Sequence, residues 1–315
     1  MVNVDLSREQ QTADRIGRFM HTHPSQNLPA LLWRLLGVCL TRRWFWVVVL
    51  LGLVGSAVFV MCQTPASLKV GTFNIQNYPK SERQPANALE LIDSLELDAL
   101  GVQEITRPHH FEKAVHVHLG PQWTVLFADQ DVRHRVGLIF DDDVFELLET
   151  HTHGETAVTR GARATFEVRL RTETTLAKRT LRIFVVHLKA GGDGGEIRRD
   201  QLRRLRPILK DAVASGDEVV VLGDFNTTGE SDRREVAALA DAAQLDWTSE
   251  ELLCTSYWSR PSDCPTTPLD HILATSPAHS VDAAGACETV GCEAEGACPV
   301  YVKRVSDHCP VTAEF

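Results

Sequence analysis

The chain has 315 residues, 32 of them Lys or Arg and 42 Asp or Glu, and its formal net charge at pH 7 is −10. Setting aside the three acids and six bases that precede residue 69 leaves 39 acidic residues against 26 basic ones, a net charge of −13. A domain this acidic does not bind nucleic acid tightly by charge alone. It can still be a nuclease if a divalent cation in its site contacts the phosphate.

The first 68 residues contain one long apolar run. Residues 44–62 carry no charged side chain, and at roughly 1.5 Å per residue a helix of this length approaches the ~30 Å hydrocarbon core of a bilayer. Arg42 and Arg43 precede the run, so the positive-inside rule places the N-terminus in the cytoplasm. We predict a cytoplasmic segment at 1–43, a single-pass transmembrane helix at 44–62, a linker at 63–68 and an extracytoplasmic domain at 69–315. A cleaved signal peptide with an unusually long leader is the alternative.

Beyond residue 68 the chain alternates between apolar runs of strand length and segments of helical periodicity. In 85–96, for example, the apolar side chains recur on one face of a helix. Strand runs with helices between them predict one large α/β (α+β) domain, with two mostly antiparallel sheets packed face to face and helices outside. The predicted strands cover 68–75, 97–105, 123–128, 135–141, 144–149, 164–170, 180–188, 218–226, 269–274 and 310–315, and the predicted helices cover 85–96, 108–118, 196–213 and 231–242.

Cysteines cluster near the C-terminus. Six of the eight fall after residue 253, and an even, clustered set in an exported domain predicts three disulfides. A zinc site is the alternative, but the spacing contains no C-x-x-C pair. The pairing stays open, with Cys298 as the suggested partner of Cys309. The candidates are Cys254, Cys264, Cys287, Cys292, Cys298 and Cys309.

Polar residues recur where apolar strands end. A strand end holds a side chain firmly at the rim of a rigid sheet, where functional sites are commonly built. Carboxylates and amides suit a hard cation such as Mg²⁺, and imidazoles suit proton transfer or contact with phosphate. These residues are Asn74, Glu104, His187, Asp224, Asn226, Asp270, Asp307 and His308.

Each short motif also has a purely structural interpretation. The "GDFN" at 223–226 is compatible with a turn that closes a strand, and His187 with a core histidine bonded to the backbone. The arginines of "EIRRDQLRRLRPILK" (196–210) are predicted to form the solvated face of an amphipathic helix rather than a track for phosphates. The ordered set of strand-end residues favours a functional interpretation.

That ordered set resembles the endonuclease/exonuclease/phosphatase superfamily. The motifs that carry the resemblance are "TFNIQNY", "VQE", "RATFEVRL", "VVHLKAGG", "VVLGDFN", "LDHI" and the terminal "SDHCPV", and they span the whole of 69–315. The resemblance implies a four-layer α/β sandwich with its site at one rim. It also implies metal-dependent hydrolysis of phosphoesters, with Mg²⁺, or Mn²⁺ or Ca²⁺, as the cofactor.

The resemblance further implies a metal site and a water site. Glu104 would be the main metal carboxylate, with Asn74 beside it. Asp307 would assist at the metal. Asp224 and Asn226 would hold or orient the attacking water and the phosphate. These roles agree with the chemistry, because a cation offsets the repulsion between a phosphodiester and hydroxide.

The remaining roles concern contact with the phosphate. By the same resemblance, His187 and His308 would flank the scissile phosphate, and Asp270 would fix His308. Arg163 would support the site. Many family nucleases place a Tyr before the strand that "RHRVGLIFD" matches, and none of the chain's three Tyr stands there. Arg135 is the candidate to replace it.

These residues predict a membrane-anchored, extracytoplasmic phosphodiester hydrolase that acts as a monomer. A nuclease that cleaves DNA or RNA is the first interpretation. A phospholipid or sphingomyelin phosphodiesterase, or a sugar-phosphate phosphatase, keeps the same site with another substrate. An inactive binding module comes last, because every metal and acid–base position of the family motifs is filled.

Overall fold

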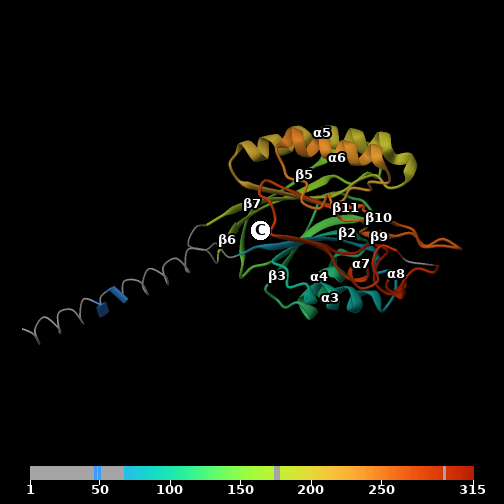
Figure 1. Ribbon diagram of the computed structural model, residues 1–315, viewed down its shortest axis with the longest axis horizontal. Coiled ribbons are helices and arrows are strands. Elements are labelled where there is room, and N and C mark those ends of the chain that lie inside the picture. The colour runs from blue at the N-terminus through green and yellow to red at the C-terminus, as the bar shows by residue number, and fades with distance from the viewer. Residues whose placement is uncertain (1–45, 48, 51–66, 174–177, 294–295) are drawn as a thin grey trace, which may run out of the picture. The chain divides into compact units, whose positions relative to one another are not determined.

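The computed structural model describes residues 46–47, 49–50, 67–173, 178–293 and 296–315 (Figure 1). Nearly all of the predicted segments that precede residue 69 lie outside these residues. Among the described residues, no helix is both long and apolar enough to span a bilayer. This contradicts the predicted single-pass location, and with it the extracytoplasmic placement and the membrane as a partner. Those predictions rested on the length of the apolar run at 44–62 and on the two arginines before it, and neither feature by itself makes a membrane span.

The first sheet has six strands in the order β12-β13-β1-β2-β4-β3. Strands β1 and β2 run parallel, whereas the other neighbouring pairs are antiparallel. The parallel pair matters for the site, because its two carboxyl ends meet at one edge of the sheet. The strands are β1 (Lys69–Tyr78), β2 (Ala99–Ile105), β3 (Trp123–Phe127), β4 (Arg135–Asp141), β12 (Ser280–Ala283) and β13 (Val311–Glu314).

The second sheet has five strands in the order β11-β8-β7-β6-β5. Here β7 and β8 are the parallel pair, with His187 opposite Asp224, and the other pairs are antiparallel. Strand β11 begins at Asp270, which also lies opposite Asp224. The strands are β5 (Phe145–His153), β6 (Thr165–Thr172), β7 (Thr180–His187), β8 (Glu218–Asp224) and β11 (Asp270–Ala274).

The two sheets face each other across an apolar core that includes Val70, Leu138, Val185 and Leu222. At Gly101 they come so close that an added Cβ would lie 2.2 Å from a methyl carbon of Leu222. Burying this apolar surface is the main stabilising contribution to the domain.

Helices cover the outer faces of both sheets. Figure 1 shows α3 and α4 against the first sheet and α5 and α6 against the second, and each pair adds its own apolar cluster. The predicted α/β sandwich is confirmed, although each sheet is mixed. The helices are α3 (Gln84–Ser94), α4 (Pro108–His118), α5 (Gly195–Ala214) and α6 (Glu230–Ala243), with short turns η1 (Gly154–Thr156) and η2 (Gly192–Gly194).

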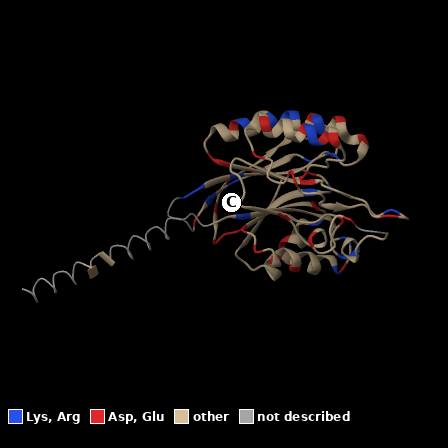
Figure 2. Cartoon of the chain, viewed as in Figure 1, with Lys and Arg blue, Asp and Glu red and all other residues tan. Residues whose placement is uncertain are grey.

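Charged residues of both signs occur along α5 (Figure 2), but one of its arginines is not solvated. Arg198 is only 2 % exposed. It pairs with Asp232 at 2.7 Å and donates to the carbonyl oxygens of Lys189 and Gly191, each at 2.7 Å. It also donates to the Thr228 hydroxyl at 3.0 Å. Arg198 therefore ties together the loops that follow His187 and Asn226, and the prediction of a uniformly solvated face was wrong at this position.

Arg198→Ala is expected to lower the free energy of unfolding by about 3–5 kcal/mol, because it leaves Asp232 and two loop carbonyls without their partner. Arg199→Ala is the matched control, since Arg199 lies on the exposed side of the same helix and pairs with Glu196 and Glu235 there. Its effect on stability should be small. Urea unfolding of the two variants measures the difference, and equal stabilities would contradict the role given to Arg198.

The C-terminal part of the domain is built from short elements that no periodicity predicts. They gather around a small apolar cluster that contains Cys254, Cys287, Cys309 and Tyr257. Three disulfides cross this region, as predicted, and they join Cys254 to Cys292, Cys264 to Cys298 and Cys287 to Cys309. The suggested Cys298–Cys309 pair was wrong. The elements are β9 (Ser256–Tyr257), β10 (Thr266–Thr267), α7 (Ala286–Thr289) and α8 (Val300–Arg304).

The Cys287–Cys309 bridge holds the residue that follows His308. Replacing both cysteines with Ser is expected to cost about 2–5 kcal/mol of stability, as for other native disulfides, and to lower kcat because His308 loses its support. Removing the Cys254–Cys292 bridge is the control. It should cost comparable stability but leave kcat nearer to that of the wild type. Thermal unfolding and initial rates measure both effects, and an equal fall in kcat for the two pairs would contradict a local role.

Candidate active site

The strand-end residues of both sheets converge on one cavity of about 410 Å³. Its polar lining comes from β1, from the carboxyl ends of β2, β7 and β8, from β9 and the residues after it, and from the segment that precedes β13. The parallel strands β7 and β8 pack closely beside the cavity. This packing requires a glycine at position 223, because a Cβ there would lie 2.0 Å from the carbonyl oxygen of Val186. The residues with amide, carboxylate or imidazole side chains that line the cavity are Gln76, Glu104, His187, Asp224, Asn226, Asp307 and His308.

Three of these residues hold strained backbone conformations. Gln76 has φ = 44°, Glu104 has φ = 62° and Asn226 has φ = 52°, in the left-handed region that residues other than glycine seldom adopt. Strain of this kind persists where the surrounding structure imposes it, and it gathers at functional sites. The "GDFN" segment closes β8 with a local hydrogen bond from the backbone N–H of Asn226 to Asp224 Oδ1 at 2.9 Å, and both residues also line the cavity.

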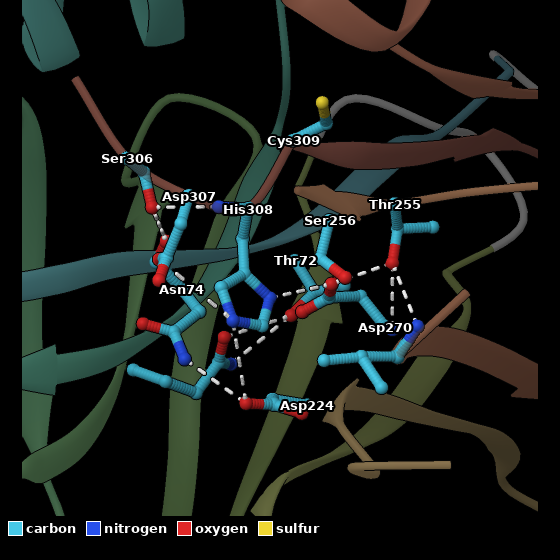
Figure 3. Close-up of polar contacts among 12 residues, drawn as sticks. Thr72, Asn74, Asp224, Thr255, Ser256, Asp270, Ser306, Asp307, His308 and Cys309 are labelled. Atoms are coloured by element: carbon cyan, nitrogen blue, oxygen red, sulfur yellow. Dashed lines mark hydrogen bonds and ion pairs between the residues drawn. The ribbon is translucent and has the colours of Figure 1, made fainter. Parts of the chain in front are cut away.

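His308 and Asp270 form a buried pair (Figure 3). The His308 Nδ1 lies 2.8 Å from Asp270 Oδ2, which also accepts a hydrogen bond from the Thr255 hydroxyl at 2.7 Å. Burial opposes the charged imidazole, but Asp270, Asp224 and Asp307 outweigh it and hold the pKa of His308 well above its usual value. Cys309 points away from this site (Figure 3).

Asp224 lies between the two histidines. Its Oδ2 is 3.4 Å from His187 Nε2 and 3.9 Å from His308 Nε2, and it accepts a hydrogen bond from Asn74 at 3.0 Å. Burial raises the pKa of Asp224 to about 7. His187 lies against the guanidinium of Arg163, and burial and this cation hold its pKa well below the usual value. The site therefore has one neutral and one charged imidazole on either side of a basic carboxylate.

Glu104 and Asp307 form the acidic side of the cavity. The backbone N–H of Asn77 donates to Glu104 Oε2 at 2.8 Å, and the amide of Gln76 donates to Asp307 Oδ2 at 2.6 Å. Each carboxylate is thus anchored through one oxygen, and the buried Asp307 Oδ1 has no hydrogen-bond partner. Burial, together with the charge of Glu104, raises the pKa of Asp307. Two anchored carboxylates of this kind fit a hard divalent cation.

A second group of potential ligands occurs nearby. Atoms of Asp224, Asp270 and His308 lie within 4.8 Å of one another. Because the imidazole and the Thr255 hydroxyl already engage one oxygen of Asp270, this trio is better explained as a hydrogen-bonded relay than as a cation site.

Six of the ten predicted site residues line this cavity: Glu104, His187, Asp224, Asn226, Asp307 and His308. Asn74, Asp270 and Arg163 do not line it, but they contact Asp224, His308 and His187, which do.

Arg135 does not line the cavity. Arg135 lies 3.7 Å from the carboxylate of Asp131 at the surface. Its neighbour His134 faces the site instead, with its Nε2 2.9 Å from the side-chain oxygen of Asn77. Burial lowers the pKa of His134, and the charge of Glu104 opposes that shift. The sequence gives no sign of this role for His134, since no periodicity marks the loop before β4.

Two further residues near the site, Gln76 and Lys80, were not predicted from the sequence. Gln76 orients Asp307, and the ammonium group of Lys80 contacts the Gln76 side chain and donates to the carbonyl oxygen of Val302 at 2.7 Å. Gln76 lies in "TFNIQNY", two residues after Asn74, and its left-handed backbone turns it toward the cavity. In the sequence, this role of Gln76 is indicated by its position two residues after Asn74.

The sequence pattern of the endonuclease/exonuclease/phosphatase family matches residues 71–308. The chain belongs to that family. Its members are metal-dependent phosphoesterases, so the prediction of a hydrolytic enzyme of this kind is confirmed. A comparison with curated proteins finds no match.

Solved structures share the fold at low identity. The D. rerio TDP2 complexed with single-strand DNA product is 15 % identical, with a TM-score of 0.62 over 79 % of this chain and 99 % of that one. The human nocturnin catalytic domain with bound sulfate is 17 % identical, with a TM-score of 0.54 over 80 % and 95 %. A mannosyl-6-phosphatase from Bacteroides thetaiotaomicron is 15 % identical, with a TM-score of 0.55 over 78 % and 98 %. At these identities the likeness shows the fold alone.

Proposed function

We propose that this phosphoesterase is a nuclease that hydrolyses phosphodiester bonds of DNA or RNA. The observation that carries the proposal is Trp258, which lines the same cavity as Glu104 and His308 and is 43 % exposed. An exposed indole beside a phosphoesterase centre offers a surface on which a base can stack. A neighbour of this fold complexed with single-strand DNA product lends further support.

In the proposed reaction, water attacks the phosphorus while Asp224 accepts its proton, which its raised pKa favours near neutral pH. The bond from phosphorus to the leaving oxygen breaks, and His308 gives that oxygen a proton. Asp270 keeps His308 charged and oriented. His187 stays neutral, and the adjacent Arg163 places a positive charge at the phosphate side of the cavity.

Glu104 and Asp307 would hold the divalent cation, with Asn74 beside them. When bound, Mg²⁺, Mn²⁺ or Ca²⁺ supplies electrostatic stabilisation of the charge that builds on the phosphate. The protein's own part is to anchor both carboxylates through Asn77 and Gln76.

A sugar-phosphate phosphatase is the second candidate, because the mannosyl-6-phosphatase shares the fold and a Trp can also pack against a sugar ring. The lipid alternative drew its support from the predicted membrane anchor, which the structure contradicts among its described residues.

The test is a substrate panel for the full-length chain with its disulfides formed. Plasmid DNA, single-stranded DNA and RNA, sphingomyelin, inositol phosphates and mannose 6-phosphate are each incubated with Mg²⁺, Mn²⁺ or Ca²⁺, beside Glu104→Ala and His308→Ala. Cleavage of nucleic acid that both variants lose is expected. Turnover of a sugar phosphate or a lipid with nucleic acid left intact would overturn the proposal.

A further inference from the structure

A second cavity of about 190 Å³ adjoins the active-site cavity. The two share Ser259 and Val302 in their walls. One wall of the second cavity is the loop between β9 and β10, and the other is the segment from Gly296 into α8. A substrate that extends from the scissile phosphate past Trp258 therefore enters this second cavity without leaving the protein surface.

The two cavities have opposite chemistry. The active-site cavity contains the carboxylates of Glu104, Asp224 and Asp307. Among the described residues, no carboxylate lines the second cavity, which carries the cations of Arg260 and Lys303. Ser259 and Ser262 add two hydroxyl groups to its walls. In a domain whose net charge is −13, such a cavity favours an anion that needs no metal ion.

Arg260 has one acidic partner, since its guanidinium lies 3.6 Å from the carboxylate of Asp263, with both side chains more than half exposed. An exposed pair at this distance contributes little to stability, so a phosphate can take its place at small cost. Lys303 lies exposed on the opposite wall.

A disulfide fixes the width of the second cavity. The bond between Cys264 and Cys298 joins the two walls, and the backbone of Trp258 is held by a 2.7 Å hydrogen bond to the carbonyl oxygen of Pro265. Walls that are joined before the ligand arrives lose little conformational entropy on binding.

We propose that this second cavity binds a neighbouring phosphate of the nucleic-acid strand whose scissile phosphate lies in the active site. Arg260 and Lys303 contact that phosphate, and Trp258 stacks on a base between the two positions. The inference rests on the proposed nuclease function and deepens it, because it selects substrates with at least two phosphates in a chain over isolated phosphoesters.

The test compares Arg260→Ala/Lys303→Ala with Arg203→Ala/Lys210→Ala, which removes the same charge from α5. The full-length proteins cleave a single-stranded oligonucleotide and, separately, the small diester bis(p-nitrophenyl) phosphate. The first variant is expected to lose about tenfold in kcat/KM on the oligonucleotide, mainly through a higher KM. For this variant, the slope of log kcat/KM against log salt concentration should become shallower by about one unit. Its rate on the small diester and both rates of the control pair should change less than twofold.

Two results would overturn the inference while the proposed function stands. One is an oligonucleotide rate equal to that of the wild type, and the other is a parallel loss on both substrates. A wild type that hydrolyses the small diester but no oligonucleotide would overturn the nuclease function itself, and the second phosphate site with it.

Discussion

Glu104→Gln is expected to lower kcat/KM for nucleic acid by roughly 10³-fold. The substitution keeps the shape of the side chain and an oxygen that can accept the hydrogen bond from Asn77, but it removes the negative charge that would hold the cation. Stabilisation by a metal ion amounts to several kcal/mol in the transition state, and each 1.36 kcal/mol or so corresponds to about tenfold in rate. The strained backbone at Glu104, with φ = 62°, should tolerate Gln as it tolerates Glu.

Initial rates over a range of Mg²⁺ concentrations measure this effect, and the Mg²⁺ concentration for half-maximal rate should rise as well. Glu112→Gln on α4 is the control, because Glu112 lies at the surface beside His109 and away from the cavity. If Glu104→Gln kept the wild-type rate and Mg²⁺ dependence, the metal role of Glu104 would be wrong.

His308→Ala is expected to lower kcat about 10³-fold, within the range for loss of a general acid. Asp270→Asn should approach that loss, since it removes the carboxylate that orients and charges the imidazole. The pH profile separates the two roles. The pKa of His308 is raised in the folded protein, so the active charged form persists below that pKa and the rate falls as pH rises through it. In Asp270→Asn this alkaline fall should move to lower pH.

The test measures kcat between pH 5 and pH 10 for the wild type and both variants. His279→Ala removes an exposed histidine just before β12 and should leave the profile unchanged. Asp270→Asn could lower the rate while its fall at alkaline pH stays where the wild type has it. That result would show that Asp270 does not set the charge of His308.

The sandwich and most of its site were predictable because they depend on local patterns. Strand β8 is buried along nearly its whole length, so its sequence "EVVVLGD" contains an apolar run that leads to Asp224, which lines the cavity. The same pattern, a polar residue at the end of an apolar strand, marked Glu104 and His187. Helix α4 matched its predicted bounds of 108–118 because Pro108 marks its first turn.

Other features depend on contacts between distant residues, which periodicity does not encode. Arg198 resembles its exposed neighbours in sequence, and its burial is explained by partners elsewhere in the fold, namely Asp232, the Thr228 hydroxyl and the carbonyl oxygens of Lys189 and Gly191. The disulfide partners follow from the path of short elements near the C-terminus, where Cys309 is bonded to Cys287 and Cys298 to Cys264. The roles of Gln76 and His134 likewise require the folded positions of Asp307 and Asn77.

Cleavage of a single-stranded oligonucleotide through one cycle of metal removal and return tests the central claim most directly. The full-length protein is treated with EDTA, assayed, and assayed again after Mg²⁺ or Mn²⁺ is added in excess. We expect no cleavage in EDTA, full recovery with metal, and little recovery for Glu104→Gln. Cleavage that persists in EDTA, or its absence with every divalent metal, would contradict a metal-dependent nuclease at this cavity.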